Sequence, residues 1–225
     1  MKPTIIALVP MRHHSQRVPR KNYRLFNGKP LFYWILTTLL RCPSLDAIYI
    51  DTDSPVIKKK AKELSDRIFI IDRPARLRGD KVAMSDILLY DVSQVKADYY
   101  LQTHSTNPLL KKEAVERAIR EFLRSRACDS LFSVTRFQKR LWTKNGRALN
   151  HNPGRLEQTQ DLPPLFEENS CLYIFSKENI RKRKNRIGQR PLMFEISKDE
   201  AFDIDEEIDF TIAETLSKWE RRKKI

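Results

Sequence analysis

Short apolar runs alternate along the chain with longer segments in which apolar residues recur at every third or fourth position. Short apolar runs bounded by turn-forming residues are typical of buried strands, and the longer periodic segments are typical of amphipathic helices. The expected strands span residues 4–9, 47–50, 68–71, 99–101, 130–134, 172–175 and 192–196. The expected helices span residues 30–40, 54–64, 85–95, 111–124 and 206–219. Because strands alternate with helices, the sequence predicts an α/β fold with a doubly wound, mainly parallel sheet.

Residues at the ends and on the inner faces of these helices refine the prediction. Ser54 and Ser85 stand where two helices begin, and a serine side chain there accepts a hydrogen bond from a free backbone N–H group. In the last helix Ile208, Ile212 and Leu216 recur at helical spacing, so we expect them to form its inward-facing stripe.

The periodic pattern fails between residues 136 and 166. Trp142, Gly146 and the pair Pro163 and Pro164 interrupt every regular spacing in this stretch. We expect an insertion that leaves the sheet, with a hairpin at residues 144–147. At 225 residues the chain suits one domain spanning residues 1–225, with this insertion at about 136–166.

The composition indicates an anionic partner but does not choose one. Lys and Arg number 43 against 29 Asp and Glu, so the formal net charge is +14. Such a charge suits nucleotide phosphates, an acidic metabolite, nucleic acid or an anionic membrane surface. No stretch approaches the roughly 18 apolar residues that span a bilayer, so we expect a cytoplasmic protein with no membrane partner. The cysteines are far apart and odd in number, which argues against a disulfide framework and a zinc ribbon.

The loop after the first expected strand, residues 12–24, concentrates basic side chains, among them Arg12 and Lys21. In open parallel sheets the ligand binds beyond the carboxyl ends of the strands, where this loop lies. Arg offers a planar fork to phosphate oxygens and Lys a compact charge, so with Ser15 and Asn22 the loop predicts an anion site. The alternative is a solvated surface loop. Neither GxxxxGKS/T nor GxGxxG is present, so side chains rather than a glycine-rich backbone must hold the anion.

A second candidate is the acidic stretch FDIDEEIDF, residues 202–210, just before the last expected helix. On an extended segment Asp203 and Asp205 project to the same side, so their carboxylates can share one hard cation, typically Mg²⁺. The alternative is an ordinary acidic helix start favoured by the helix dipole, which accounts for Glu206 and Glu207.

A third candidate is LQTHSTNPLL, residues 101–110, which leaves an expected strand with a succession of hydrogen-bonding groups that includes Gln102 and His104. Such groups suit a polyhydroxylated or carboxylated small molecule. Ser, Asn and Pro also make plain turns, so this stretch alone is a weak signal.

Taken in order, these stretches resemble the CMP-sugar synthetases, the acylneuraminate cytidylyltransferase family. MRHHSQRVPRKN at residues 11–22 looks like the family's ARGGSKGIPRKN, and NGKPL follows it in a similar way. LQTHSTNPLL is similar to the family's LQPTSPLR, FDID to its DID before a helix, and QDLPPLFEENSCLYIF to its QDLP and ENG segments. The resemblance implies a Rossmann-like nucleotidyltransferase fold and a reaction of CTP with an acidic sugar that releases pyrophosphate. It also implies a homodimer formed through the inserted arm, with Leu141 and Trp142 either at that contact or packed on their own subunit.

The resemblance assigns the nucleotide-binding residues one by one. Arg12 and Lys21 match positions that contact the triphosphate, in the same loop as Ser15. Asn22 matches a position near the nucleoside. The cytidine-recognition positions are matched by two further residues, Arg73 and Ser85.

The resemblance also assigns the acceptor side and the metal. Gln102 matches a contact to the sugar, His104 lies beside it, and Glu168 holds the acidic position before the ENG-like strand. Mg²⁺ is expected on Asp203 and Asp205. Of these, Asp205 joins Arg12 and Lys21 as the implied catalytic set for in-line attack on the α-phosphorus.

Three histidines depart from the family pattern. His13 and His14 replace a glycine pair, and His104 replaces a residue of the PTSP motif. Because loops after different parallel strands converge, we expect the three imidazoles near the reacting phosphate or the acceptor. Adjacent histidines suit a zinc site poorly, so hydrogen bonding to an anionic ligand is the preferred interpretation.

The sequence leaves more than one acceptor and more than one class of function open. A sialic, legionaminic or pseudaminic acid is the leading acceptor, a Kdo-like acid comes next, and a phosphonate is a further choice. A homologue that binds CTP without turnover is also consistent with the sequence. From another class, a non-catalytic nucleic-acid-binding protein is suggested by the basic runs 17–24, 139–147 and 181–190, although no helix-turn-helix, zinc-finger or RRM signature is present.

Overall fold

The computed structural model describes residues 2–222, so Met1 and residues 223–225 of the expected domain lie outside the described residues. Its centre is a seven-stranded sheet in the order β5-β4-β1-β6-β8-β7-β9. The strands are β1 Ile5–Leu8, β4 Ala47–Thr52, β5 Ile68–Asp72, β6 Tyr99–Thr103, β7 Ser130–Phe137, β8 Leu165–Phe175 and β9 Pro191–Glu195. Each overlaps one of the predicted strands. All neighbouring pairs are parallel except the two that β8 makes with β6 and β7, so the predicted mainly parallel sheet is confirmed.

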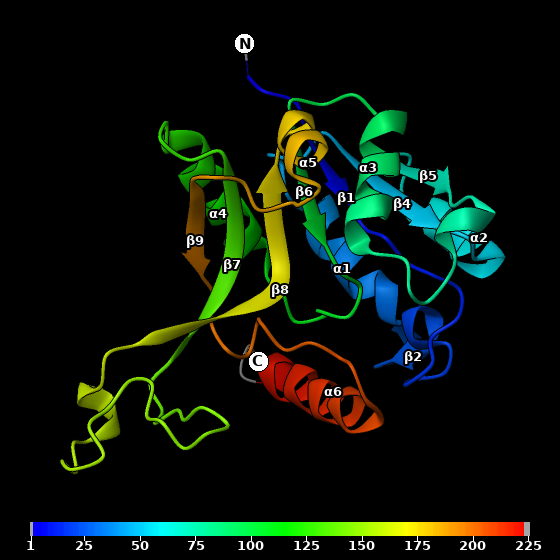
Figure 1. Cartoon of the computed structure of the whole chain (residues 1–225). Helices are drawn as coiled ribbons and strands as arrows, with labels where there is room; N and C mark the ends of the chain where they lie inside the picture. Colours follow the sequence, from blue (N-terminus) through cyan, green and yellow to red (C-terminus); the bar gives the residue numbers. More distant parts are fainter. Residues whose placement is uncertain (1, 223–225) are drawn as a thin grey trace.

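Helices cover both faces of this sheet (Figure 1). They are α1 Leu31–Leu40, α2 Pro55–Lys62, α3 Met84–Gln94, α4 Lys112–Arg124, α5 Lys177–Arg183 and α6 Glu207–Arg222. Buried residues of α1, α2 and α4 share one apolar core, and those of α3 and α5 share a second on the opposite face. The fold is therefore doubly wound, as predicted.

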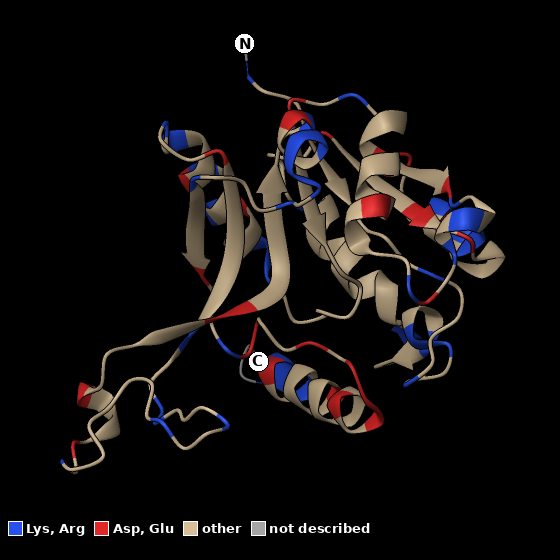
Figure 2. Cartoon of the chain, in the orientation of Figure 1, with Lys and Arg blue, Asp and Glu red and all other residues tan. Residues whose placement is uncertain are grey.

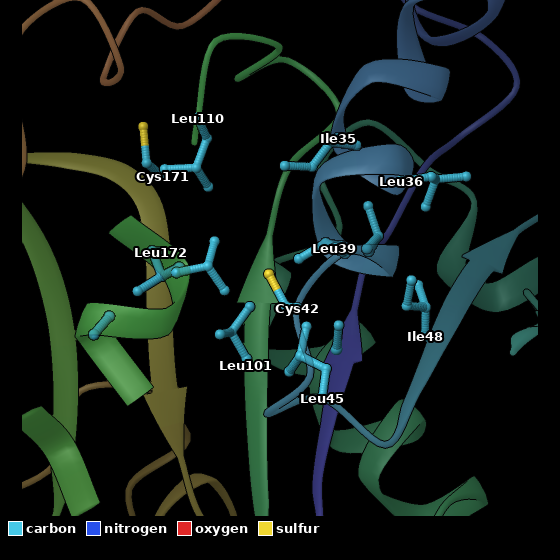
Figure 3. Packing of buried hydrophobic residues seen from close by; sticks show 14 of the residues in the cluster. Ile35, Leu36, Leu39, Cys42, Leu45, Ile48, Leu101, Leu110, Cys171 and Leu172 are labelled. Carbon is cyan, nitrogen blue, oxygen red and sulfur yellow. The ribbon is translucent and has the colours of Figure 1, made fainter. Parts of the chain in front are cut away.

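The larger core is built on α1, whose apolar residues pack against the middle of the sheet (Figure 3). Ile35 and Leu39 of the helix lie among Ile48 of β4, Leu101 of β6 and Leu172 of β8, and all five side chains are buried. Burying a side chain of this size contributes roughly 1.5–3 kcal/mol, so this cluster holds the strands under the functional loops in place.

Two details of the helix prediction differ in outcome. Ser54 caps α2, because its side chain accepts a hydrogen bond from the Ile57 backbone N–H. The prediction for Ser85 was wrong: α3 begins at Met84, and Ala83 at its N-cap makes no side-chain cap hydrogen bond.

The predicted inner face of α6 was also wrong. Ile208 and Ile212 are exposed, at 60% and 39%, and Leu216 is half-buried, whereas Phe210 and Ala213 are buried. A small third core decides which face of α6 is buried. In it the ring centroids of Phe210 and Phe26 are 5.6 Å apart. Phe26 belongs to β2 Leu25–Phe26, which pairs with β3 Lys29–Pro30 through a turn whose Asn27 and Gly28 both have positive φ.

Residues 138–164 connect β7 to β8 and extend away from the sheet as an arm (Figure 1). The predicted hairpin is present: Trp142 and Ala148 form an antiparallel bridge, and Gly146 takes a φ of 75° in the turn between them. Within the described residues, no helix has the length and apolar character needed to cross a membrane.

Candidate active site

A cavity of about 430 Å³ opens beyond the carboxyl ends of β1, β5 and β6. Its lining comes from the loop after β1, residues 73–87 after β5, residues 104–106 after β6 and the chain that enters α6, together with Ser170 of β8 and Arg186 of the segment after α5. This is the position at which open α/β sheets bind their ligands. The sequence-predicted residues that it brings together are Arg12, Ser15, Lys21, Asn22, Arg73, His104, Asp203 and Asp205. Ser85, Gln102 and Glu168 do not line it.

Lys21 lies at the first turn of η1 Lys21–Tyr23, between the basic loop and the acidic pair. Its Nζ donates to the Ile204 carbonyl at 2.6 Å and lies 3.5 Å from an Asp205 carboxylate oxygen. Burial lowers the pKa of Lys21 from its ordinary value, and the carboxylates of Asp205 and Asp203 oppose that shift. Arg17 also pairs with Asp205, at 2.8 Å, but from a largely exposed position. The positive loop and the acidic pair are therefore in direct contact in the lining of one cavity.

Asp203 is the more buried member of the acidic pair. Burial raises the pKa of its carboxyl, a hydrogen bond from Thr106 opposes the shift, and the charge of Asp205 adds to it. Its Oδ1 is buried and has no hydrogen-bond partner among the described residues. A carboxylate oxygen left without a donor beside a second carboxylate fits a hard cation, and Mg²⁺ commonly uses one or two carboxylates together with phosphate oxygens. No group of three or more potential metal ligands occurs in the described part of the chain, so a metal here would need ligands from the nucleotide or water.

Asp80 is a cavity residue that the sequence interpretation missed. It forms an ion pair with Arg12 and accepts a hydrogen bond from Gln16 at 2.6 Å. These contacts hold the loop after β1 against the segment between β5 and α3. No motif marks Asp80, because one acidic residue in an irregular loop carries no spacing signal.

Asn22 links the two loops that form the floor of the cavity. Its Nδ2 donates to the Arg12 carbonyl at 2.7 Å, and its Oδ1 accepts from the Ser105 hydroxyl at 2.6 Å. Because its amide is engaged on both sides, Asn22 positions the loop after β1 against the loop after β6.

Gln102 is fully buried, so it supports residues of the cavity wall and does not itself offer the predicted contact to the sugar. Its Oε1 accepts a hydrogen bond from Arg186, and its Nε2 lies 2.8 Å from Nε2 of His104. Both partners line the cavity. Arg186 was missed because it belongs to the basic run 181–190, which the sequence interpretation treated as a separate charge feature. Figure 2 shows that α5, just before it, is mostly basic.

Glu168 and Ser85 lie outside this cavity. Glu168 lines an adjoining hollow of about 500 Å³, which shares Ser170, Asp203 and Asp205 with the first. The predicted acceptor-side residue is therefore next to the acidic pair. Ser85 is in the first turn of α3, beside the cavity residue Met84, and does not itself line the wall.

The expected convergence of three imidazoles was wrong. Only His104 of the three lines the cavity. The His13 ring stacks on Tyr23 with ring centroids 5.2 Å apart, and its Nδ1 lies 2.8 Å from the Ser54 hydroxyl oxygen. His14 is exposed and packs edge-on against His13. The double histidine therefore supports the loop from outside the cavity.

Comparison with known proteins places this arrangement in a family. The model of the cytidylyltransferase family matches residues 6–224. The chain belongs to the cytidylyltransferase family. Thus the family resemblance read from the sequence is confirmed.

Among its curated relatives, the N-acylneuraminate cytidylyltransferase of Streptococcus agalactiae serotype V is 26% identical over 93% of this chain. The chain spans about half of that enzyme's length, 52%. The CMP-N,N'-diacetyllegionaminic acid synthase of Legionella pneumophila is 28% identical, and the match covers 94% of this chain and 95% of the relative.

Solved structures agree on the fold of this cytidylyltransferase. CMP:2-keto-3-deoxy-manno-octonic acid synthetase in complex with CTP matches 96% of this chain and 99% of its own, with a TM-score of 0.72 and 14% identity. The 4-diphosphocytidyl-2C-methyl-D-erythritol synthase of Anaerococcus prevotii gives a TM-score of 0.71 at 11% identity, over 96% of this chain and 97% of its own. The fold is that of the Rossmann-like nucleotidyltransferases.

One wall of the cytidylyltransferase cavity rests on a buried charged cluster. Arg73 follows β5 and is 3% exposed, and its guanidinium pairs with the fully buried Asp51 of β4. Burial, followed by the charge of Asp51, raises the pKa of Asp91 on α3 to about 9. Asp91 is therefore protonated and uncharged at neutral pH beside the ion pair of Arg73 with Asp51.

We predict that Asp91→Asn removes a pH dependence of stability. The folded-state pKa of Asp91 is raised above its unfolded value near 4, so the wild type loses stability as pH rises from about 4 to about 9. Asparagine resembles the protonated acid and does not ionise. In urea unfolding at pH 5, 6.5 and 8, the free energy of unfolding of the variant should increase relative to that of the wild type as pH rises, by at most about 1.4 kcal/mol per pH unit. A difference that is the same at all three pH values would contradict the protonated state of Asp91.

Proposed function

We propose that this cytidylyltransferase transfers a cytidylyl group from CTP to an acidic sugar and releases pyrophosphate. The proposal is carried by one observation: Arg12, Lys21, Asp203 and Asp205 line the same cavity at the carboxyl edge of the sheet. Cations that face a carboxylate pair suit a nucleoside triphosphate with its metal. The relatives named for N-acylneuraminate and for diacetyllegionaminic acid support a nonulosonic acid as acceptor. A Kdo-like acid comes second, with support from the octonic acid synthetase fold.

The proposed reaction is an in-line displacement at the α-phosphorus. An acceptor hydroxyl oxygen forms the new P–O bond and gives up its proton to solvent, and the bond from the α-phosphorus to the bridging oxygen of pyrophosphate breaks. Arg12 and Lys21 offset the negative charge that grows on the phosphate oxygens and on the departing pyrophosphate. Asp203 and Asp205 would hold Mg²⁺, which when bound would add to the neutralisation of the triphosphate charge and would lower the pKa of the acceptor hydroxyl.

His104 has a hydrogen-bonding part in this proposal and no proton-transfer part. Burial, aided by the charges of Arg186 and Lys21, lowers its pKa to about 3. The ring is neutral at neutral pH, so protonating it there would cost several kcal/mol. Its free N–H group can still orient a ligand oxygen in the cavity.

The test is release of pyrophosphate by the purified chain with CTP, Mg²⁺ and a panel of sialic, legionaminic, pseudaminic and Kdo-type acids, with phosphonates as a separate arm. We expect turnover with at least one carboxylic acid and stabilisation of the fold against heat by CTP more than by ATP, GTP or UTP. The absence of both turnover and CTP-specific stabilisation would contradict the proposal. Salt-sensitive binding to random DNA in place of both would favour the nucleic-acid class.

We also propose a cytoplasmic homodimer formed through the arm. Trp142, Leu149 and Leu156 are 51%, 52% and 94% exposed, and several exposed apolar side chains on one protruding segment favour a contact surface. Light scattering after size exclusion should give twice the 26.6 kDa chain mass, and Leu156→Glu should lower that mass or make it concentration-dependent. A monomeric wild type at micromolar concentration would contradict the dimer.

A further inference from the structure

Arg186 differs from the other cations of the cavity in how its charge is balanced. Arg12 pairs with Asp80, Lys21 with Asp205 and Arg73 with Asp51. Arg186 makes no such ion pair within the described residues, although the charge of Glu168 acts on it and opposes the lowering of its pKa by burial. Its Nη1 donates instead to the neutral amide of Gln102, and its guanidinium carbon lies 3.5 Å from the centroid of the Tyr173 ring.

The surroundings of Arg186 fix its plane and leave donors free. The Tyr173 ring covers one face of the guanidinium, and Gln102 accepts from one nitrogen. Guanidinium carries five N–H donors in a rigid fork, so donors remain for a ligand. Arg186 is half-buried and lines the cavity, which places those donors where a small molecule binds.

Gln102 also sets the hydrogen-bonding state of His104. Because its Oε1 accepts from Arg186, its Nε2 must donate, and it lies 2.8 Å from Nε2 of His104. That ring nitrogen is therefore the acceptor, and neutral His104 carries its proton on Nδ1. One buried amide thus holds two donor side chains, Arg186 and His104, at the same part of the wall.

The triphosphate has cations elsewhere in the cavity. Arg12, Arg17 and Lys21 come from the loop after β1, and two of them, Arg17 and Lys21, pair with Asp205. Arg186 comes from the segment between α5 and β9, and its partner Tyr173 donates to Glu168, which lines the adjoining hollow. A half-buried, planar cation on the side of that hollow favours an anion of the acceptor.

Resting on the proposed function, we propose that Arg186, held by Gln102 and Tyr173, binds the carboxylate of the acceptor and selects acidic acceptors. A planar carboxylate matches the guanidinium fork, whereas a phosphonate matches it less well. His104 donates a second hydrogen bond through its Nδ1–H group. Gln102 is a positioning residue, since it has no exposed surface of its own.

The test compares Arg186→Gln and Arg186→Lys with the wild type on N-acetylneuraminic acid, N,N'-diacetyllegionaminic acid and their methyl esters. Arg183→Gln is the matched control, because Arg183 is an exposed cation of α5 outside the cavity. We expect Arg186→Gln to raise the acceptor KM by roughly 30-fold and Arg186→Lys by less. The KM for CTP and the CTP-induced shift in melting temperature should stay within about 2-fold of wild type, and so should every parameter of Arg183→Gln.

The esters separate a charge interaction from a packing defect. If Arg186 binds the carboxylate, the wild type and Arg186→Gln should use the esters about equally poorly. Esterification and the substitution remove the same interaction, so their effects are not additive. The wild-type comparison of acid with ester does not depend on any variant folding.

Several outcomes would overturn the inference. If the wild type turns over the acids and Arg186→Gln has an unchanged acceptor KM, the inference is overturned and the proposed function stands. The same holds if Arg186→Gln loses affinity for CTP and for the acid equally. Turnover with phosphonates and with no carboxylic acid overturns the carboxylate assignment. A wild type that neither binds CTP nor releases pyrophosphate contradicts the proposed function and the inference with it.

Discussion

Asp203→Asn should lower kcat/KM for CTP by roughly three orders of magnitude. The Oδ1 of Asp203 is buried without a partner among the described residues, and Asp205 lies beside it. An amide keeps the shape of the side chain but offers a neutral oxygen, so the hold on a hard cation weakens. In initial-rate measurements of pyrophosphate release, the Mg²⁺ concentration for half-maximal rate should rise at least about tenfold.

The control for this variant comes from the same acidic run. Glu206 is exposed and outside the cavity, so Glu206→Gln should stay within about 2-fold of wild type in both rate and Mg²⁺ requirement. Full turnover by Asp203→Asn with an unchanged Mg²⁺ requirement would show that the acidic pair serves the start of α6 and holds no metal.

Lys21→Met should lower kcat/KM for CTP by roughly 10²- to 10³-fold. The Lys21 side chain is 13% exposed, so its charge acts through little water and its effect on phosphate oxygens is large. Methionine has a similar length and no charge, which limits the loss of packing. The measurement is the same pyrophosphate assay, with thermal unfolding to show that the fold survives.

Arg17→Met supplies the comparison for Lys21, because both cations pair with Asp205. The Arg17 side chain is 61% exposed, and exposed charges are screened by water and salt. We expect Arg17→Met to lower kcat/KM for CTP by less than about tenfold. Equal losses for the two variants would mean that burial of Lys21 is not what makes its charge effective.

The sheet was predictable because its strands are short apolar runs that both core layers bury. Every predicted strand is present, and the carboxyl-edge rule then located the cavity from the loop after β1 alone. The helix α5 was missed because its seven residues include only one buried side chain, Ile180, so no apolar period exists to read.

The site was predictable where residues near in sequence form it and unpredictable where tertiary contacts decide. Asp203 and Asp205 follow from a two-residue spacing. Gln102 in a strand and Arg186 in a basic run become partners only when β6 and the chain after α5 meet in space. His13 was predicted to be functional because it replaces a glycine of the family pattern, but its ring stacks on Tyr23.

The inner face of α6 shows the same limit. Its isoleucines recur at helical spacing, yet the helix covers only a small apolar patch that includes Val18, Phe26 and Leu31, and Phe210 of the helix packs into that patch. Spacing identifies which residues share a face. The space left by the rest of the fold decides which face is buried.

The direction of β8 has a consequence for the arm. Because this strand runs opposite to β6, it starts at the cavity edge, so one continuous ribbon joins the arm to the residues around Glu168. Side chains alternate between the two sides of a strand, and inserting or deleting one residue at its start would turn that whole stretch over. The length of the arm can vary, but the phase in which it re-enters the sheet cannot.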